Sequence, residues 1–369
     1  MKERVAHPEV YIGDKALPRL VAFCREHALS RFALVADRNT YAALGRAAEA
    51  ALADSGCDVL TILLEGDDIG VDATYVFDTM LALDRVPRTF LAVGSGTVTD
   101  VTRFVSHRLG REFISLPTAP SVDGYTSVGA PMVIHGVKRT VSCHGPLAVF
   151  AHLPTLCAAP RPMLAAGFGD MLAKLTSSAD WEIGSLLWGE RYDPEIARRG
   201  RAAAWASAHA VDSIAAAGCD GVTALMDGLI ESGFCMLDFG GTLPASGNEH
   251  HTSHLWEMKL LREGRHSVLH GAKVGLAVIG SLRRYNRLAA LSQSEVEALL
   301  AGAGRPDREA ALAEIRAAFG PLADEVIATD RPFLDLTPAQ FEALKARILA
   351  HWDEIHRIAA ELPSADQMI

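Results

Sequence analysis

Short apolar runs alternate with helical patterns through the first part of the chain, and this alternation limits the fold more than any other feature. The runs occupy residues 32–37, 59–64, 90–93 and 113–116, and helical spacing fills 17–27 and 40–55. Strand-length runs that alternate with helices indicate a mainly parallel sheet with helices on both faces. We therefore predict an α/β domain over residues 1–153, completed by a hairpin at 131–143 and a last strand at 147–150.

The pattern changes after Pro154, and strand signals become rare. Helical spacing covers residues 162–187, 194–217, 220–236, 292–301, 305–319 and 338–361. This predicts an all-helical second domain over residues 154–369. Two domains of this kind form a cleft between them, which is the usual place for a small-molecule site.

Composition excludes several classes of protein. The net charge of the 369 residues is −10, which argues against a nucleic-acid partner. No apolar run reaches the roughly 18 to 20 residues that a membrane span needs, and the first residues lack the apolar core of a signal peptide. The six cysteines are scattered without a CxxC pair, which favours reduced thiols in a cytoplasmic protein.

A glycine-containing loop, residues 94–100, follows the third predicted strand and leads into a helix. Its glycines would let the backbone approach a pyrophosphate, and the helix N-terminus would offer unpaired N–H donors, as in a nucleotide-binding domain. The full GxGxxG fingerprint is absent because position 99 is threonine, so a tight turn without ligand is the alternative. Asp37, which ends the first run, either bonds a ribose hydroxyl or caps the next helix.

Small polar residues crowd the loop at 116–127, after the fourth predicted strand. Hydroxyls at Thr118, Ser121 and Ser127 suit a nicotinamide or a phosphate, and Asp123 can hold a substrate hydroxyl. The alternative is a turn rich in proline, serine and glycine that binds nothing.

Histidines in the second half suggest a metal site. His250 and His254 are four residues apart, so a helix places both on one face, and His270 precedes a glycine. With Asp170 as carboxylate, two imidazoles make a divalent-metal site with an open position. The alternatives are a surface HxxxH pair and an Asp170 that caps or opens a helix, since residues 166–175 begin or interrupt one.

Five motifs, taken in order, resemble the sn-glycerol-1-phosphate dehydrogenases, especially the bacterial branch. They are residues 94–100 (GSGTVTD), 117–131 (PTAPSVDGYTSVGAP), 167–170 (GFGD), 250–254 (HHTSH) and 270–275 (HGAKVG). This family belongs to the superfamily of glycerol dehydrogenase, iron-containing alcohol dehydrogenase and dehydroquinate synthase. The resemblance implies a dehydroquinate synthase-like fold and an oxidoreductase that transfers hydride between NAD or NADP and dihydroxyacetone phosphate, within phospholipid metabolism.

The resemblance also implies the roles of individual residues. The metal, zinc, nickel or ferrous iron, is expected on Asp170, His250 and His270. The substrate is expected on Asp123, Asp170 and His254, with Asp123 and His254 as catalytic residues. The cofactor is expected on Asp37, Gly94, Gly96, Thr97, Val98, Thr99, Asp100, Thr118, Ser121 and Ser127.

Two departures from the family pattern stand out. Tyr125 and Thr126 replace residues that are often small, which would narrow the substrate pocket. No phosphate-binding cations can be identified from the sequence, so the substrate's phosphate depends on the resemblance alone. The choice of cofactor is also open, because Asp37 would repel a 2′-phosphate whereas Arg38 would accommodate one.

Other functions stay open at this point. The chain could act on glycerol or a small aldehyde, or it could be a carbocycle-forming lyase like dehydroquinate synthase. It could also bind a metal or nucleotide without catalysis. The resemblance further implies a homodimer or larger assembly that acts on a small molecule.

Overall fold

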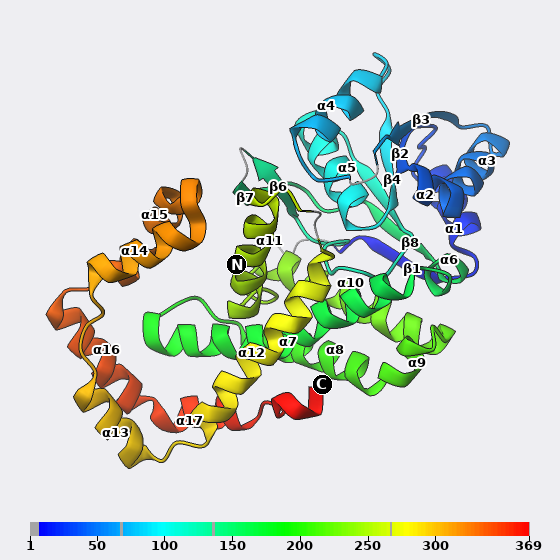
Figure 1. Ribbon diagram of the computed structural model, residues 1–369. Coiled ribbons are helices and arrows are strands. Elements are labelled where there is room, and N and C mark those ends of the chain that lie inside the picture. Colours follow the sequence, from blue (N-terminus) through cyan, green and yellow to red (C-terminus); the bar gives the residue numbers. More distant parts are fainter. Residues whose placement is uncertain (1–6, 67–68, 135–136, 266–267, 369) are drawn as a thin grey trace.

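The computed structural model describes residues 7–66, 69–134, 137–265 and 268–368. Figure 1 shows an α/β half in blue and cyan that stands over a helical half in green, yellow and red. His135 and Gly136, in the predicted hairpin, lie outside the described residues. No helix in the described ranges is long and apolar enough to cross a bilayer.

Six strands form one parallel sheet in the α/β half, in the order β1-β8-β5-β4-β2-β3. They are β1 (Glu9–Gly13), β2 (Arg31–Asp37), β3 (Asp58–Leu64), β4 (Thr89–Gly94), β5 (Phe113–Pro117) and β8 (Ala148–His152). The predicted parallel sheet is confirmed. Strand β1 was not predicted, because this short edge strand is only half-buried and lacks a long apolar run.

Helices cover both faces of this sheet. They are α1 (Ala16–Glu26), α2 (Arg38–Thr40), the π-helical turn η1 (Tyr41–Gly45), α3 (Arg46–Asp54), α4 (Ala73–Ala82) and α5 (Gly96–Arg108). Alternate residues of β2 enter different cores: Leu34 packs with residues of α1 and α3, whereas Val35 packs with residues of α5. A strand buried on both faces explains why its sequence is a continuous apolar run.

The order in which strands are added to the sheet reverses at β2, which has β3 on one side and β4 on the other. The register pairs Val35 with Ala92, so Asp37 and Gly94 end their strands side by side. Ligands of open α/β sheets bind at the carboxyl ends of the strands at such a reversal. The glycine-containing loop therefore lies where the fold favours a cofactor.

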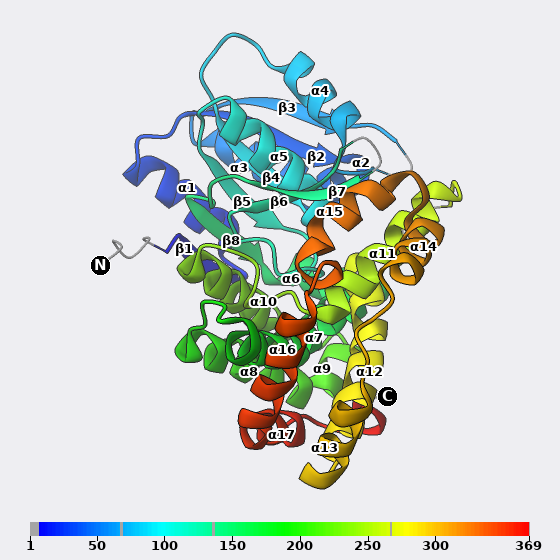
Figure 2. The same cartoon turned by 90° about the vertical axis from the view of Figure 1, so that its left-hand side faces the viewer.

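A small antiparallel hairpin, β6 (Gly129–Ile134) and β7 (Val137–Ser142), follows the polar loop, as predicted. It lies next to α11 (Asn248–Arg262) in both views (Figures 1 and 2).

The described residues after β8 form helices, turns and loops. The helices are α6 (Leu153–Cys157), α7 (Arg161–Trp188), α8 (Pro194–His209), α9 (Val211–Ala215), α10 (Cys219–Phe239), α11, α12 (His270–Ala289), α13 (Gln293–Gly302), α14 (Arg308–Phe319), η2 (Gly320–Leu322), α15 (Ala323–Leu334), α16 (Pro338–Ala350), α17 (Trp352–Ala360) and η3 (Ala365–Met368). The helical second half is confirmed. A boundary between separate domains at residue 153 stays a prediction.

Glycines let α7 and α12 approach closely. A side chain at Gly271 would collide with the carbonyl oxygen of Ala166, and one at Gly275 would stand 2.9 Å from the Cα of Gly169. Asp170 lies well inside α7, which runs without a break from Arg161 to Trp188. The alternatives that Asp170 caps a helix, lies in its first turn or interrupts it are therefore wrong. Gly169 serves the packing of α7 against α12, whereas Gly167 lets α7 approach the backbone of the polar loop at Pro120, so neither glycine marks a helix start.

Candidate active site

Three helices bring the predicted metal ligands together. Asp170 comes from α7, His250 from α11 and His270 from α12, and their ligand atoms all lie within 4.8 Å of one another. The Nε2 atom of His250 is 3.6 Å from Oδ1 of Asp170, and the two imidazole rings are 5.3 Å apart between centroids. Two nitrogen donors and one carboxylate oxygen suit zinc, nickel or ferrous iron.

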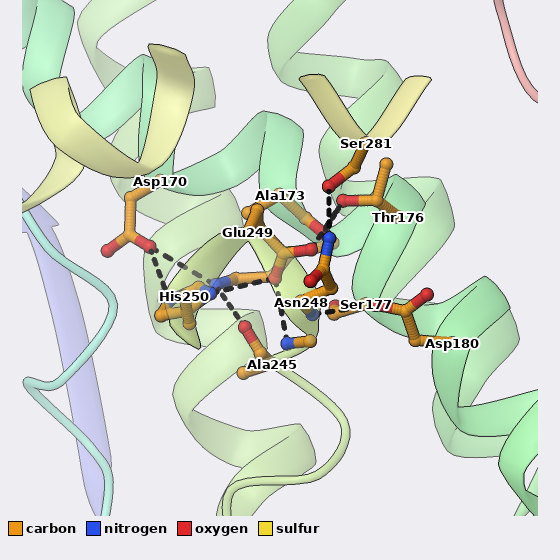
Figure 3. A network of polar contacts seen from close by, with 12 residues as sticks. Asp170, Ala173, Thr176, Ser177, Asp180, Ala245, Asn248, Glu249, His250 and Ser281 are labelled. Carbon is orange, nitrogen blue, oxygen red and sulfur yellow. Dashed lines mark hydrogen bonds and ion pairs between the residues drawn. The ribbon is translucent and has the colours of Figure 1, made fainter. Parts of the chain in front are cut away.

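Glu249, which the sequence analysis missed, orients His250 (Figure 3). Oε1 of Glu249 lies 2.8 Å from Nδ1 of His250 and accepts the Gly247 N–H at 2.7 Å, while Thr176 donates to Oε2. The carboxylate is fully buried. Burial alone would raise its pKa, but the hydrogen bond with His250 holds the pKa below the ordinary value. An ionised partner at Nδ1 leaves Nε2 of His250 free to bind a cation.

Lys174 is a second buried partner that the sequence analysis missed. Its Nζ lies 3.2 Å from Oδ1 of Asp170 and 2.8 Å from Oδ2 of Asp123, and it donates to the Ala245 carbonyl at 3.0 Å. Burial would favour neutral Asp170, yet the Lys174 ammonium keeps the pKa of that carboxyl below its ordinary value. The i, i+4 spacing of Asp170 and Lys174 on a helix was the signal available in the sequence.

His270 provides an observation on which the fit of a metal ion can be tested. Its Nδ1 atom is buried and has no hydrogen-bond partner among the described residues. Burial lowers the pKa of His270 well below its usual value, so the ring is neutral and can offer a lone pair. An orphaned nitrogen beside a second imidazole and an ionised carboxylate fits a divalent cation.

His254 lies one turn after His250 on the same helix, but it belongs to a second group, with Glu257 and His270. Its side chain is one-third exposed, and its ring stacks near His270 with centroids 5.7 Å apart. Burial lowers the pKa of His254, so its ring is unprotonated at neutral pH. The imidazole therefore has access to solvent next to the triad, as a group that exchanges protons requires.

The cofactor loop leads directly from β4 into α5. Ser95 precedes this helix, and its side chain makes no capping hydrogen bond, which leaves the first N–H groups of α5, including those of Gly96 and Thr97, for an anion. The side chains of Val98 and Thr99 are buried, and the Thr99 hydroxyl has no hydrogen-bond partner among the described residues. Their predicted contacts with the cofactor, like that of Gly94, are not tested by the fold.

Asp100 and Arg103 tie α5 to the polar loop. Asp100 accepts a hydrogen bond from Arg103 at 2.7 Å, and burial raises the pKa of Asp100 to about 7. Arg103, which the sequence analysis missed, is fully buried and also donates to the carbonyls of Gly124, Tyr125 and Gly129. One guanidinium thereby fixes the loop against the helix.

Asp37 acts as a helix cap in the structure. Its Oδ1 accepts the N–H groups of Asn39 at 2.7 Å and Thr40 at 2.9 Å, and the Thr40 hydroxyl accepts the N–H of Asp37 in return. This was one of the two alternatives from the sequence. A contact with a ribose stays a prediction, which the position of Asp37 beside the loop at Gly94 favours.

The side chains of Thr118, Ser121 and Ser127 in the polar loop are nearly buried, and the two serine hydroxyls bond within the protein. Ser121 bonds Ser95 at the start of α5, and Ser127 donates to the Gly124 carbonyl at 3.1 Å. The backbone N–H of Thr118 donates to the Gly94 carbonyl at 3.2 Å. Hydrogen bonds thus join the glycine-containing loop to the polar loop at the carboxyl edge of the sheet. The predicted contacts of both loops with a cofactor remain untested.

Tyr125 and Thr126 do not line the open site. Both side chains are fully buried; Tyr125 donates to the Ala119 carbonyl at 2.5 Å, and Thr126 to that of Ile230 at 3.1 Å. The expectation that they narrow the substrate pocket is wrong, because they anchor the loop from beneath.

Asp123 joins the polar loop to the helical half. Its Oδ2 accepts Lys174 and the Ser232 hydroxyl, each at 2.8 Å, and its backbone N–H donates to Oδ2 of Asp170 at 3.1 Å. The carboxylate stands next to the triad, and its contact with a substrate stays a prediction.

Comparisons with known proteins agree with this geometry. A family model described as iron-containing alcohol dehydrogenase matches residues 11–160. A glycerol-1-phosphate dehydrogenase [NAD(P)+] from Geobacillus stearothermophilus is 42% identical over 283 residues, which cover 76% of this chain and 70% of the relative. One from Bacillus subtilis (strain 168) is 38% identical over 323 residues, covering 85% and 82%.

Solved structures share the fold at low identity. Glycerol dehydrogenase from Schizosaccharomyces pombe matches with a TM-score of 0.65 and 16% identity, over 99% of this chain and 95% of that one. A 2-deoxy-scyllo-inosose synthase complexed with carbaglucose-6-phosphate, NAD+ and Co2+ matches with a TM-score of 0.57 and 15% identity, over 78% and 77%. The predicted fold class, an α/β half with a parallel sheet and a helical remainder, is confirmed.

Proposed function

This chain belongs to the glycerol-1-phosphate dehydrogenase family, and from that premise we propose that it transfers hydride between NAD(P)H and dihydroxyacetone phosphate to give sn-glycerol 1-phosphate. The observation that carries the proposal is the meeting of Asp170, His250 and His270 from three helices, beside a loop that can take a dinucleotide. The product's use in phospholipid metabolism stays a prediction.

In this proposal Asp170, His250 and His270 hold one zinc, nickel or iron ion. When bound, the ion supplies a Lewis acid for the substrate oxygen. Glu249 keeps His250 in the tautomer whose Nε2 faces the site, and Lys174 keeps Asp170 ionised. The first turn of α5 receives the cofactor's pyrophosphate, and Asp123 fixes a hydroxyl of the substrate.

His254 is proposed to carry the proton. Its ring is neutral at neutral pH, so in the oxidising direction it can take the proton of the alcohol. By microscopic reversibility, the same nitrogen returns the proton when the carbonyl is reduced. Its partly exposed ring can exchange that proton with water.

The test is an assay of NADH and NADPH oxidation with dihydroxyacetone phosphate and, separately, dihydroxyacetone, together with metal analysis of the purified protein. We expect turnover that prefers the phosphorylated substrate, and its loss together with bound metal in His250→Ala and His270→Ala. His254→Ala should keep the metal and lose most turnover. His251→Ala, an exposed neighbour, is the control.

Contrary results have distinct meanings. Phosphate release without net oxidation of the cofactor would indicate a carbocycle-forming lyase, and preference for dihydroxyacetone would indicate a glycerol-type dehydrogenase. Cofactor binding without any turnover would indicate a non-catalytic protein. Wild-type metal content and turnover in both histidine variants would remove the triad from the proposal.

A cytoplasmic location and a homo-oligomeric assembly are further proposals. All six cysteines are free thiols, which supports a reducing compartment. Light scattering on the purified protein measures the assembly.

A further inference from the structure

A cluster of charged side chains beside the triad has no role in the mechanism above. Lys138 comes from β7, Glu257 from α11 and Lys273 from α12. The Nζ atoms of Lys138 and Lys273 lie 2.8 Å and 3.2 Å from the same carboxylate oxygen, Oε2 of Glu257. Nδ1 of His254 is 3.8 Å from that oxygen. We call Lys138 and Lys273 the lysine pair, and Glu257 supplies the carboxylate that both of them contact.

This cluster holds more positive than negative charge. Two ammonium groups face one carboxylate, and the side chains of Lys138, Lys273 and Glu257 are only 15%, 5% and 11% exposed. Asp100 lies within electrostatic range of Lys138, but Arg103 is hydrogen-bonded to it. A buried excess of positive charge is costly without a further anion.

Lys273 also has unused donors. Its Nζ is close enough to Glu257 for an ion pair, yet it makes no hydrogen bond with a described residue. An ammonium group carries three N–H donors and no acceptor. The excess charge and the free donors together indicate an anionic ligand with several oxygens.

The position of the cluster relates it to the substrate. His270 belongs both to the triad and to the group with His254 and Glu257, each group having its ligand atoms within 4.8 Å. In dihydroxyacetone phosphate, one methylene and one ester oxygen separate the carbonyl carbon from the phosphorus. A carbonyl oxygen at the triad therefore brings the phosphate into the range of the lysine pair.

We propose that Lys138 and Lys273 form the binding site for the phosphate of the substrate, with Glu257 as the carboxylate that holds both ammonium groups in place. This inference rests on the proposed function and deepens it. Charge-assisted bonds from two ammonium groups discriminate a phosphate ester from the free alcohol or ketone. The pair comes from a hairpin of the α/β half and a helix of the second half, so the phosphate would also hold the two halves together around the reacting carbon.

The experiment uses Lys138→Met and Lys273→Met, which keep most of the stem and remove the charge, in the metal-loaded enzyme. We expect kcat/KM for dihydroxyacetone phosphate to fall at least roughly tenfold in each variant, mainly through KM, while kcat/KM for dihydroxyacetone is unchanged. Lys259→Met, an exposed position two residues after Glu257, is the control and should keep the wild-type ratio.

A second measurement does not depend on turnover. With NADH saturating, so that the pyrophosphate site is filled, inorganic phosphate should raise the melting temperature of the wild type and of Lys259→Met. It should not raise that of Lys138→Met or Lys273→Met. Lys273→Arg, which keeps the charge, should recover part of the shift. If Lys273→Met does not fold, the less buried Lys138→Met decides the question by itself.

The two proposals fail in different ways. A wild type that does not reduce dihydroxyacetone phosphate would overturn the proposed function, and the phosphate-induced shift would still decide on the lysine pair. Variants that keep both the wild-type substrate ratio and the phosphate-induced shift would overturn the lysine pair and leave the dehydrogenase proposal standing.

Discussion

Asp170, Lys174 and Glu249 keep their charges in the interior because each is paired. Lys174 lies between two carboxylates, and Glu249 accepts from His250, Thr176 and Gly247. An isolated buried charge would cost several kcal/mol, whereas these pairs satisfy one another. Lys174 and Glu249 therefore hold Asp170 and His250 in place through their own charges.

Glu249 should control metal affinity at the residue scale. Glu249→Gln keeps an oxygen for Thr176 or Gly247 but removes the negative charge next to Nδ1 of His250, so we expect metal affinity to fall about tenfold to a hundredfold. Excess metal should restore much of the turnover. Competition with a chelator measures the affinity, and exposed His251→Ala is the control. An unchanged metal affinity would show that the charge of Glu249 does not contribute to metal binding.

Asp180 should give stability a pH dependence. Burial and, to a smaller extent, nearby Glu249 raise the pKa of Asp180 to about 6; Oδ2 accepts the Asn248 N–H at 2.7 Å, and Oδ1 accepts the Tyr285 hydroxyl. The folded state then binds the proton more tightly than the unfolded state, whose pKa is about 3.9. The free energy of unfolding should fall by about 2 kcal/mol as pH rises from about 4 to about 7.

Asp180→Asn removes that titration. Relative to the wild type, its free energy of unfolding should increase with pH over the same window, because the variant has no proton to lose at this site. Urea unfolding in EDTA at several pH values measures the difference without a contribution from metal. Parallel profiles for the two proteins would mean that Asp180 is ionised in the fold already at low pH.

Sequence reasoning named the three residues of the triad but missed most of their partners. Asp170, His250 and His270 stand in short motifs with recognisable spacing. Lys138 lies more than a hundred residues from Glu257, and nothing in the local pattern of either residue indicates that a hairpin and a helix meet there. Arg103 likewise resembles an ordinary helical arginine until the loop that it binds is folded.

At the scale of elements, α7 and α12 form the frame of the site. Gly271 faces the backbone of Ala166 so closely that no side chain fits, and His270 immediately precedes this contact. The helices therefore fix the distance between His270 and Asp170. Gly167 and Gly169 had suggested a helix start at Asp170, because a glycine required by packing cannot be told from one required by a turn in a single sequence.

Two glycines of α12 should respond in opposite ways to alanine. Gly271→Ala must push α12 away from α7, so we expect a loss of about 3 kcal/mol in stability and weaker metal binding. Gly280 on the same helix has nothing within 4 Å of an added Cβ, so Gly280→Ala should gain about 1 kcal/mol. Unfolding midpoints measure both. Equal changes in the stability of the two variants would show that the close contact at Gly271 does not fix the position of α12.

Elements with strong periodicity were predicted well, and weakly patterned ones were not. The core strands β2, β4 and β5 coincide with apolar runs because both of their faces are buried. The helix predicted over 338–361 is two helices, α16 and α17, which break at His351. The helix predicted over 194–217 is likewise α8 and α9. Apolar spacing continues across each break, so the sequence alone did not show it.

For the whole molecule, the site depends on contacts between the two halves. Asp123 reaches from the polar loop to Lys174 and Ser232, and Thr126 donates to the Ile230 carbonyl. Both groups therefore connect the edge of the sheet to α7 and α10. Ligands that touch both halves must bind the folded state and not the unfolded chain, so they should stabilise the whole protein by mass action.

Removal of the metal should lower the melting temperature without unfolding the protein, because the ion would bind side chains from three helices that only the folded state brings together. At a free concentration of one hundred times Kd, a bound ion adds about 2.7 kcal/mol, which corresponds to several degrees for a chain of this size. Lys174 still partners Asp170 after the ion leaves, so the apo protein should stay folded. Calorimetry after dialysis against EDTA, and again after zinc is restored, measures the shift. His270→Ala should melt at the same temperature with and without zinc, and a zinc-dependent shift in that variant would place the ion elsewhere in the molecule.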